Sequence, residues 1–206
     1  MKIKVCGLKE PDNISEVVAL QPDYVGFICY NKSPRYIDVL VAGALEQLPK
    51  NITKTGVFVN ESAEQINALI EKYNFKAIQL HGSETPEFCA LFKGRIQVIK
   101  AFGVDADFDF DTLKPYENVV DIFLFDTKTA AHGGSGKTFD WQVLTNYTLN
   151  VPFFLSGGIG LGNLEEVKTV KHPQLAGLDL NSRFELSPGN KDINKLKQAF
   201  EIIKQL

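Results

Sequence analysis

The chain has 206 residues, of which 44% are hydrophobic and 23% charged, so it can bury one full core and leaves little room for two domains. Its formal net charge of -3 and the lack of a basic tract argue against nucleic acid as the main partner. The first residues lack the apolar core of a secretion signal, and no apolar run is long enough to span a membrane. Three widely spaced cysteines predict neither a disulfide framework nor a paired metal site, so we expect a cytoplasmic protein.

Short apolar runs, rich in strand-forming residues, recur along the chain. They read as near-continuous apolar stretches, which is typical of strands buried on both faces. We expect strands at residues 2–6, 24–28, 55–59, 77–80, 97–102, 122–125, 152–155 and 175–180.

Helical patterns separate these runs. Ser62 and Gln65 form a capping-box pattern before one helix, and Pro86 after Thr85 stands at a first-turn position of another. Helices are expected at 14–20, 63–73, 87–92, 164–170 and 193–203, with weaker patterns at 107–116 and 140–147.

Strand and helix thus alternate throughout, which predicts a parallel sheet. Eight such units can close into a single-domain (β/α)8 TIM barrel over residues 1–206. An open doubly wound sheet is the alternative, but the glycine-rich dinucleotide turn is missing after the first strand.

The active site of such a barrel lies where the strands end and the following loops begin. Polar, sulfur-containing and small residues occupy these predicted ends. They are Cys6-Gly7, Cys29-Tyr30, Asn60, His81-Gly82, Asp126-Thr127, Ser156-Gly157-Gly158 and Asn181-Ser182-Arg183.

Cys6 and Asp126 are the two candidates for proton transfer. A lone cysteine is more often a small buried apolar residue, but at a barrel rim amides and cations can supply a thiolate. An aspartate often caps a turn, but a partly buried carboxyl can hold a proton near neutral pH and act as an acid. Together they predict isomerisation by general acid–base catalysis, without a metal or organic cofactor.

Glycines cluster in the last three loops, at 133–136, at 156–162 and in the segment around Ser182. The loops after the seventh and eighth strands predict phosphate binding, because they are the usual phosphate site of these barrels. Arg183 either adds charge there or faces solvent. Arg35 suits a planar carboxylate, or is a surface arginine. His81 either contacts substrate or is structural.

Residues 131–138 fit a relaxed nucleotide phosphate-loop pattern, with alanine in place of the first glycine. Such a loop leaves its strand directly and runs into a helix. Here five residues intervene and the following helical pattern is short, so nucleotide hydrolysis is disfavoured.

Ordered motifs covering nearly the whole chain resemble one family, the phosphoribosylanthranilate isomerases of tryptophan biosynthesis. They are KVCGLK (4–9), VGFICYNKSPRYI (25–37), GVFVN (56–60), IQLHGSE (78–84), FLFDTK (123–128), GGSGKTFDW (133–141), FLSGGIGLGN (154–163), GLDLNSRFE (177–185) and PGNKD (188–192).

The resemblance implies a (β/α)8 barrel, an Amadori rearrangement of N-(5-phosphoribosyl)anthranilate, Asp126 as general acid and Cys6 as general base. It further implies that Arg35 holds the anthranilate carboxylate. The phosphate would be bound by Gly157, Gly158 and the segment Asn181, Ser182 and Arg183. We also expect His81 and Asp179 among the substrate-binding residues. One departure is Arg183, since the family often has Ser-Ser-Gly-Val-Glu where this chain has residues 181–185. We expect the protein to bind a small phosphorylated substrate and to exist as a monomer or a homodimer.

Two other functions stay open at this point. A barrel isomerase acting on a histidine-pathway aminoaldose would use two carboxylates, against which the cysteine at the first strand argues. A non-catalytic barrel that binds a phosphorylated ligand would need neither Cys6 nor Asp126.

Overall fold

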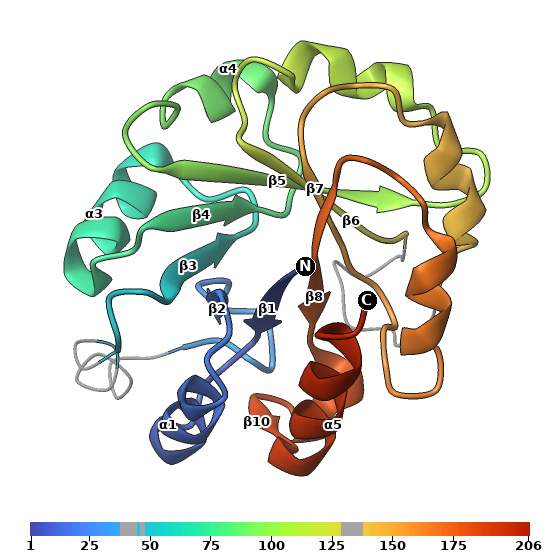
Figure 1. The fold of residues 1–206 in the computed structure, drawn as a ribbon. Coiled ribbons are helices and arrows are strands. Elements are labelled where there is room, and N and C mark those ends of the chain that lie inside the picture. The colour runs from blue at the N-terminus through green and yellow to red at the C-terminus, as the bar shows by residue number, and fades with distance from the viewer. Residues whose placement is uncertain (38–44, 46–47, 129–137) are drawn as a thin grey trace.

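The computed structural model describes residues 1–37, 45, 48–128 and 138–206, and eight parallel strands within them form a closed barrel (Figure 1). Neighbouring strands pair in chain order, and the last pairs back with the first, with Lys4 opposite Asp179. The predicted TIM barrel is therefore confirmed. Its strands are β1 (Lys2–Cys6), β2 (Tyr24–Ile28), β3 (Thr53–Phe58), β4 (Ala77–Leu80), β5 (Gln97–Val104), β6 (Ile122–Thr127), β7 (Phe153–Leu155) and β8 (Leu175–Leu180).

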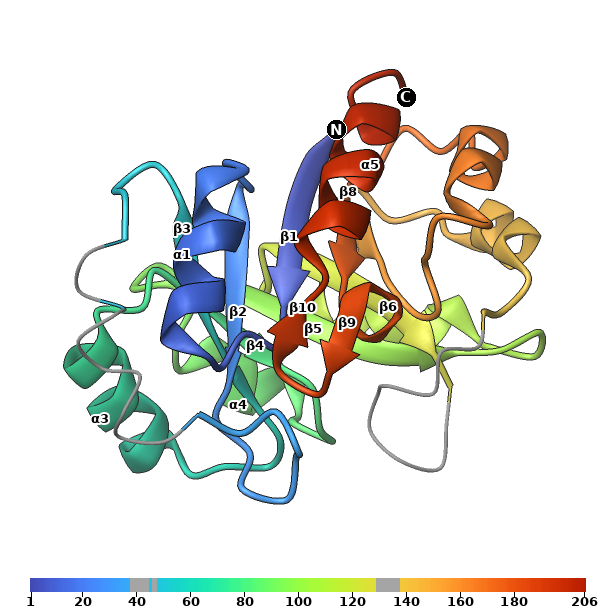
Figure 2. The same ribbon diagram turned by 90° about the horizontal axis from the view of Figure 1, so that it is seen from below.

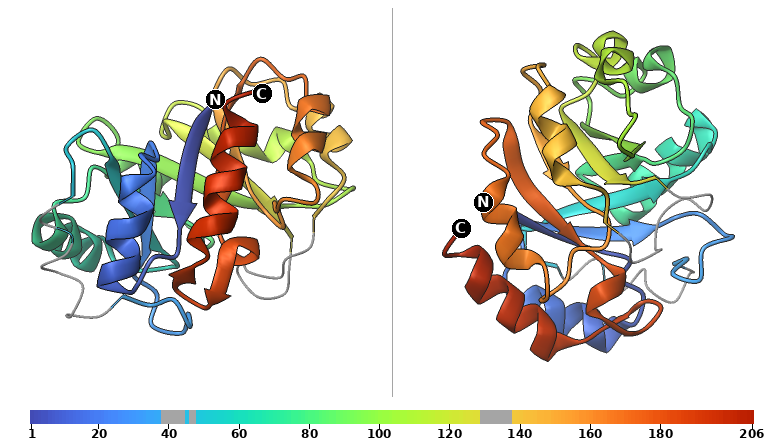
Figure 3. Two further views of the ribbon diagram at one scale, coloured as in Figure 1. Left: turned by 60° about the horizontal axis from the view of Figure 1, so that its bottom comes forward. Right: turned by 90° about the vertical axis from the view of Figure 1, so that its right-hand side faces the viewer.

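The helices α1 (Pro11–Ala19), α3 (Ala63–Tyr73), α4 (Pro86–Ala90) and α5 (Ile193–Ile203) lie outside the barrel wall (Figures 2 and 3). Two of them start as their sequences predict. The Ser62 hydroxyl accepts a hydrogen bond from the Gln65 amide at 3.2 Å, and the Thr85 hydroxyl accepts one from the Phe88 amide. These side chains satisfy amides that a helix start leaves without an internal partner.

The connections after β5, β6 and β7 contain 3₁₀ helices, where the sequence predicted ordinary helices. They are η2 (Phe110–Tyr116), η3 (Trp141–Asn146) and η4 (Leu164–Thr169). In η2 the reason is Pro115, which has no amide hydrogen to donate within a helix. The three helices span seven, six and six residues, which is long for this tighter helix.

Two layers of apolar side chains follow from the alternation along each strand. The larger layer lies between the strands and the outer helices. The smaller fills the barrel interior, where the ring of Phe154 packs edge-on against that of Tyr24. Both faces of each strand are thus buried, which explains the near-continuous apolar runs in the sequence.

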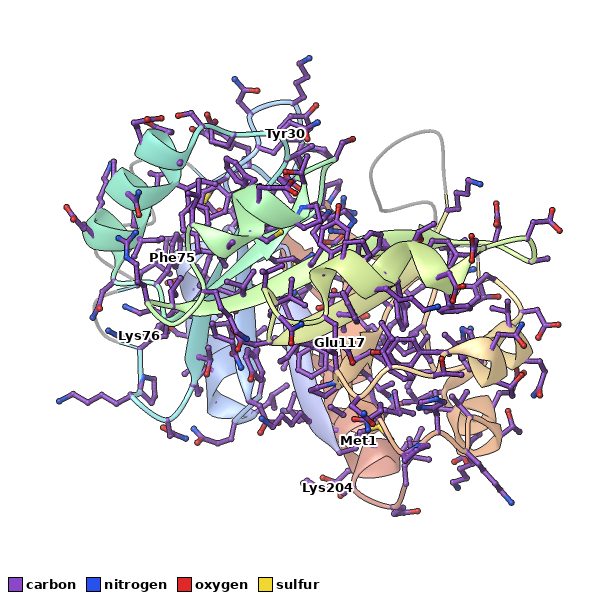
Figure 4. The ribbon with its side chains drawn as sticks, turned by 90° about the horizontal axis from the view of Figure 1, so that it is seen from above. Met1, Tyr30, Phe75, Lys76, Glu117 and Lys204 are labelled. Atoms are coloured by element: carbon purple, nitrogen blue, oxygen red, sulfur yellow. The ribbon has the colours of Figure 1, made fainter. Side chains whose placement is uncertain are left out.

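All eight strands run the same way, so their carboxyl ends meet at one edge of the barrel. Tyr30 follows β2 at that edge, while Met1 and Lys204 lie at the other end (Figure 4). After β8 the chain forms a 3₁₀ turn, η5 (Ser182–Phe184), and a small antiparallel pair, β9 (Glu185–Ser187) and β10 (Asn190–Lys191). This added hairpin brings charged side chains to the carboxyl edge beside β1.

Within the described part of the chain, no helix is both long and apolar enough to cross a membrane.

Candidate active site

Cys6 is the last residue of β1 and faces the barrel interior. It pairs in register with Gly26 of β2, and a Cβ built at Gly26 would lie 2.7 Å from the Cys6 sulfur. Burial raises the pKa of the Cys6 thiol, and the nearby ammonium groups of Lys4 and Lys191 oppose that rise without cancelling it. The predicted base is therefore a buried thiol with cations around it.

Gly7 brings two predicted substrate residues close to Cys6. Its backbone has φ +76°, which favours glycine, and its amide donates to the Gly26 carbonyl. A Cβ at this position would lie 2.7 Å from Arg35 Cδ and 2.8 Å from Asn181 Oδ1. Glycine is therefore required for this close approach of three chain segments.

Arg35 is oriented by Glu185 from the added hairpin. Its Nε and Nη2 donate to the two carboxylate oxygens, with the Nε–Oε1 distance 2.8 Å and the Nη2–Oε2 distance 2.6 Å. The buried ammonium of Lys191 donates to Glu185 Oε1 at 2.7 Å and to Asn181 Oδ1 at 2.8 Å. This bidentate pairing fixes the plane of the guanidinium next to the barrel mouth.

Asp179 lies inside the barrel below these loops. Its carboxylate accepts a hydrogen bond from Lys4 Nζ at 2.8 Å, and Ser156 Oγ donates to its other oxygen at 3.3 Å. Both charged side chains are buried. Asp179, which was predicted to be a substrate-binding residue, is thus held in an ion pair with Lys4 inside the barrel.

Asp126 and His81 form the second centre of the site. Asp126 Oδ2 lies 3.5 Å from His81 Nε2, and the other ring nitrogen, Nδ1, lies 2.7 Å from Gln79 Nε2. The Asp126 side chain is 12% exposed. Gly157 approaches from the next strand, and a Cβ there would lie 2.8 Å from Asp126 Oδ1. Two strand ends and one glycine loop therefore define the surroundings of this carboxyl.

The loop after β7 and the turn after β8 enclose a cavity of about 340 Å³. Asn163 shapes the loop, since it accepts from the Gly160 amide at 2.8 Å and donates to the Gly158 carbonyl at 3.1 Å. Ser182 and Arg183 start the turn η5. The cavity is lined by Gly158, Gly160, Leu161, Gly162, Asn163, Arg183 and Lys195.

The structure thus divides the predicted site residues among three neighbourhoods. Arg35 and Asn181 lie around Cys6, with Asp179 below; His81 and Gly157 lie around Asp126; Gly158 and Arg183 line the cavity, next to Ser182. Among the described residues, no group of three or more metal-binding side chains is present. Residues 131–137 of the phosphate-loop pattern lie outside the described residues.

Sequence reasoning did not identify several charged residues of this site. They are Lys4, Glu185, Lys191 and Lys195. The sequence contained one signal for Lys4. It is a charged residue within an apolar strand, two residues before Cys6 and therefore on the same face of the strand. The hairpin residues carry no comparable local signal.

The chain is similar to known proteins over its whole length. A family model described as N-(5'-phosphoribosyl)anthranilate (PRA) isomerase matches residues 3–202. The N-(5'-phosphoribosyl)anthranilate isomerase of Parabacteroides distasonis is 47% identical, covering 98% of this chain and 93% of that protein. The enzyme of the same name from Phocaeicola vulgatus is 44% identical, covering 98% of this chain and all of that one.

Solved structures agree with this assignment. Phosphoribosyl anthranilate isomerase from Thermotoga maritima superposes with a TM-score of 0.88 at 35% identity, covering 100% of both chains. A phosphoribosyl anthranilate isomerase in complex with reduced 1-(o-carboxyphenylamino)-1-deoxyribulose 5-phosphate has a TM-score of 0.85 at 31% identity, with 100% of both chains covered. This chain therefore belongs to the N-(5'-phosphoribosyl)anthranilate isomerase family and is an isomerase of tryptophan biosynthesis.

Proposed function

We propose that this chain rearranges N-(5'-phosphoribosyl)anthranilate to 1-(2-carboxyphenylamino)-1-deoxyribulose 5-phosphate with Asp126 as general acid and Cys6 as general base. The observation that carries the proposal is their placement. Each residue ends or nearly ends a strand at the same edge of one closed barrel, and each side chain is buried beside polar partners. An aldose-to-ketose rearrangement needs one group that gives a proton and one that takes a proton.

In the first step the carboxyl of Asp126 gives its proton to the furanose ring oxygen. The bond between that oxygen and C1 breaks, and the nitrogen lone pair forms the C1–N double bond of a Schiff base. Asp126 is left as a carboxylate, 3.5 Å from His81 Nε2. His81 stabilises this charge when that nitrogen carries its hydrogen.

In the second step the Cys6 thiolate removes the proton from C2. The electron pair of that bond moves toward nitrogen and gives an enolamine, which then tautomerises to the ketone with a proton delivered to C1. The electron pairs shift within the substrate and the protein exchanges only protons with it, so these steps call for no metal or organic cofactor.

The two ends of the substrate are charged, and the site offers cations for both. Glu185 occupies the Nε–Nη2 edge of Arg35, so the Nη1 side of the guanidinium would take the anthranilate carboxylate. The phosphate would enter the cavity lined by Gly158 and Arg183, where Lys195 adds a further charge. Backbone amides of the glycine-rich loop would donate to its oxygens.

The test is turnover of freshly generated substrate, followed by the loss of its fluorescence. Cys6→Ala and Asp126→Asn should each abolish most turnover while the circular dichroism spectrum stays that of the wild type. Cys89→Ala is the matched control, because this cysteine is buried outside the site and its loss should leave turnover unchanged.

Substantial turnover in either site variant removes that residue from its proposed role. A folded wild-type protein that binds the reduced product analogue without turnover would instead support the non-catalytic barrel. Activity on a histidine-pathway aminoaldose alone would support the other isomerase.

We also propose that the chain works in the cytoplasm, on a small phosphorylated substrate, without a membrane or nucleic acid partner. It would act as a monomer or a homodimer, which sedimentation velocity distinguishes. One related solved structure is described as monomers generated from the dimeric enzyme of Thermotoga maritima, at 32% identity and a TM-score of 0.82.

A further inference from the structure

We propose that Lys4 is a positioning residue for catalysis: its buried ammonium, held by Asp179 in the space left by Gly26, stabilises the Cys6 thiolate that removes the C2 proton, against the burial that disfavours this anion. The inference rests on the proposed role of Cys6 as base. It assigns to an interior lysine a part in the reaction, beyond the ion pair that it forms with Asp179.

The Lys4 ammonium and the Cys6 sulfur lie close together in the barrel interior. Lys4 and Cys6 are two residues apart on β1, so both side chains face inward. Gly26 faces them from β2, and a Cβ built there would lie 3.1 Å from Lys4 Nζ and 2.7 Å from Cys6 Sγ. Any larger residue at this position would occupy the space in which the two groups meet.

The charges around Cys6 favour an anion. Lys4 is paired with Asp179 below the thiol, and Arg35 and Lys191 share Glu185 above it. Among the described residues, these five side chains comprise three cations and two carboxylates, an excess of one positive charge before the substrate carboxylate binds. An unbalanced charge in a buried cluster is costly, and a thiolate at Cys6 balances it.

Burial and the Lys4 ammonium act on the Cys6 thiol in opposite directions. Burial raises the pKa of Cys6, and Lys4 is the largest influence that opposes the rise, ahead of Lys191. In turn Asp179 and Cys6 together raise the pKa of Lys4 against its own burial. The ammonium and the thiolate therefore stabilise each other.

A difference measurement separates the Cys6 titration from those of the other two cysteines. Burial raises the pKa of Cys29 to about 12 and that of Cys89 to about 11. Below these values, the thiolate absorbance of the wild-type protein minus that of Cys6→Ala reports Cys6 alone. This readout requires no catalytic activity.

The experiment compares Lys4→Met with the wild type by two measurements. One is the pH titration of the thiolate difference absorbance, and the other is the acid limb of the pH profile of kcat/KM. Both midpoints should rise by about one pH unit or more, which lowers kcat/KM near neutral pH by about tenfold or more. Lys54→Met is the matched control, since it removes a buried lysine from the opposite face of a barrel strand, and neither midpoint should move.

A second variant should shift the thiolate titration of Cys6 in the opposite direction. Asp179→Asn removes the counterion of Lys4, so the thiolate titration should move to lower pH. Lys4→Arg keeps the cation, so its thiolate titration midpoint should stay close to that of the wild type. These two variants carry the test if Lys4→Met fails to fold.

Unchanged midpoints in folded Lys4→Met overturn the proposal, as does an unchanged or raised titration in Asp179→Asn. Failure of the proposed function gives a different result. Full turnover by Cys6→Ala would remove Cys6 as the base, whereas the absorbance titration would still measure the effect of Lys4 on the thiol.

Discussion

Gly157→Ala tests how the loop after β7 positions the proposed acid. Gly157 has φ +86°, a region in which an alanine costs roughly 1–2 kcal/mol. The new Cβ would lie 2.5 Å from the Thr127 amide nitrogen and 2.8 Å from Asp126 Oδ1. A backbone atom cannot rotate away, and overpacking of this kind costs about 1–3 kcal/mol more. We expect the free energy of unfolding to fall by about 2–5 kcal/mol.

The same clash displaces the carboxyl that is proposed to protonate the ring oxygen. A displacement of about 1 Å at a reacting group can cost about a hundredfold in rate, so kcat should fall by about 10–100-fold. Urea unfolding gives the stability, and the fluorescence assay gives kcat and KM on the same samples.

Two other glycines separate the cost of backbone strain from the cost of the close contacts. Gly94 has φ +80° but nothing within 4 Å of a built Cβ, so Gly94→Ala should lose only the roughly 1–2 kcal/mol of backbone strain and keep full activity. Gly162, in the same loop as Gly157, has neither a positive φ nor an atom within 4 Å of a built Cβ. The free energy of unfolding of Gly162→Ala should therefore stay within about 0.5 kcal/mol of the wild-type value. If Gly157→Ala were as stable and active as Gly162→Ala, the argument from close contact would be refuted.

Three further predictions concern the charged side chains. Arg35→Ala should raise KM more than it lowers kcat, and an unchanged KM in the turnover assay would contradict the carboxylate contact. Burial raises the pKa of Glu185, but the hydrogen bond from Arg35 and the charge of Lys191 outweigh it and hold that pKa below its ordinary 4.5. A carboxyl whose pKa is lower in the folded protein than in the unfolded chain stabilises the fold above the unfolded-state pKa, and this stability is lost as the pH falls through the folded-state pKa. Below about pH 4.5, the urea midpoint should therefore fall more steeply with pH in the wild type than in Glu185→Gln. Equal slopes for the two proteins would count against this argument. Lys100→Met leaves the buried Glu84 carboxylate without its 3.1 Å partner and should cost about 3–5 kcal/mol in urea unfolding, part of which Lys100→Met/Glu84→Gln should restore.

The order of elements and the closed barrel could be predicted from the chain because their signals are local. Strands buried on both faces need continuous apolar runs, and the predicted run at 122–125 lies within β6. The start of α3 could be predicted for the same reason, since Ser62 caps an amide only three residues away. Positions at strand ends follow from this order, which is how Cys6 and Asp126 could be singled out before any contact was known.

The partners of these residues depend on tertiary structure. Lys4 and Asp179 are 175 residues apart, and Arg35 and Glu185 are 150 apart. No local pattern specifies such pairs, because they form only when the last strand closes on the first and the hairpin after it folds over the mouth. The sequence by itself determined which elements form and which side chains reach the barrel edge. Closure of the barrel decided which charges surround the thiol, because charges act through distance in space and not along the chain.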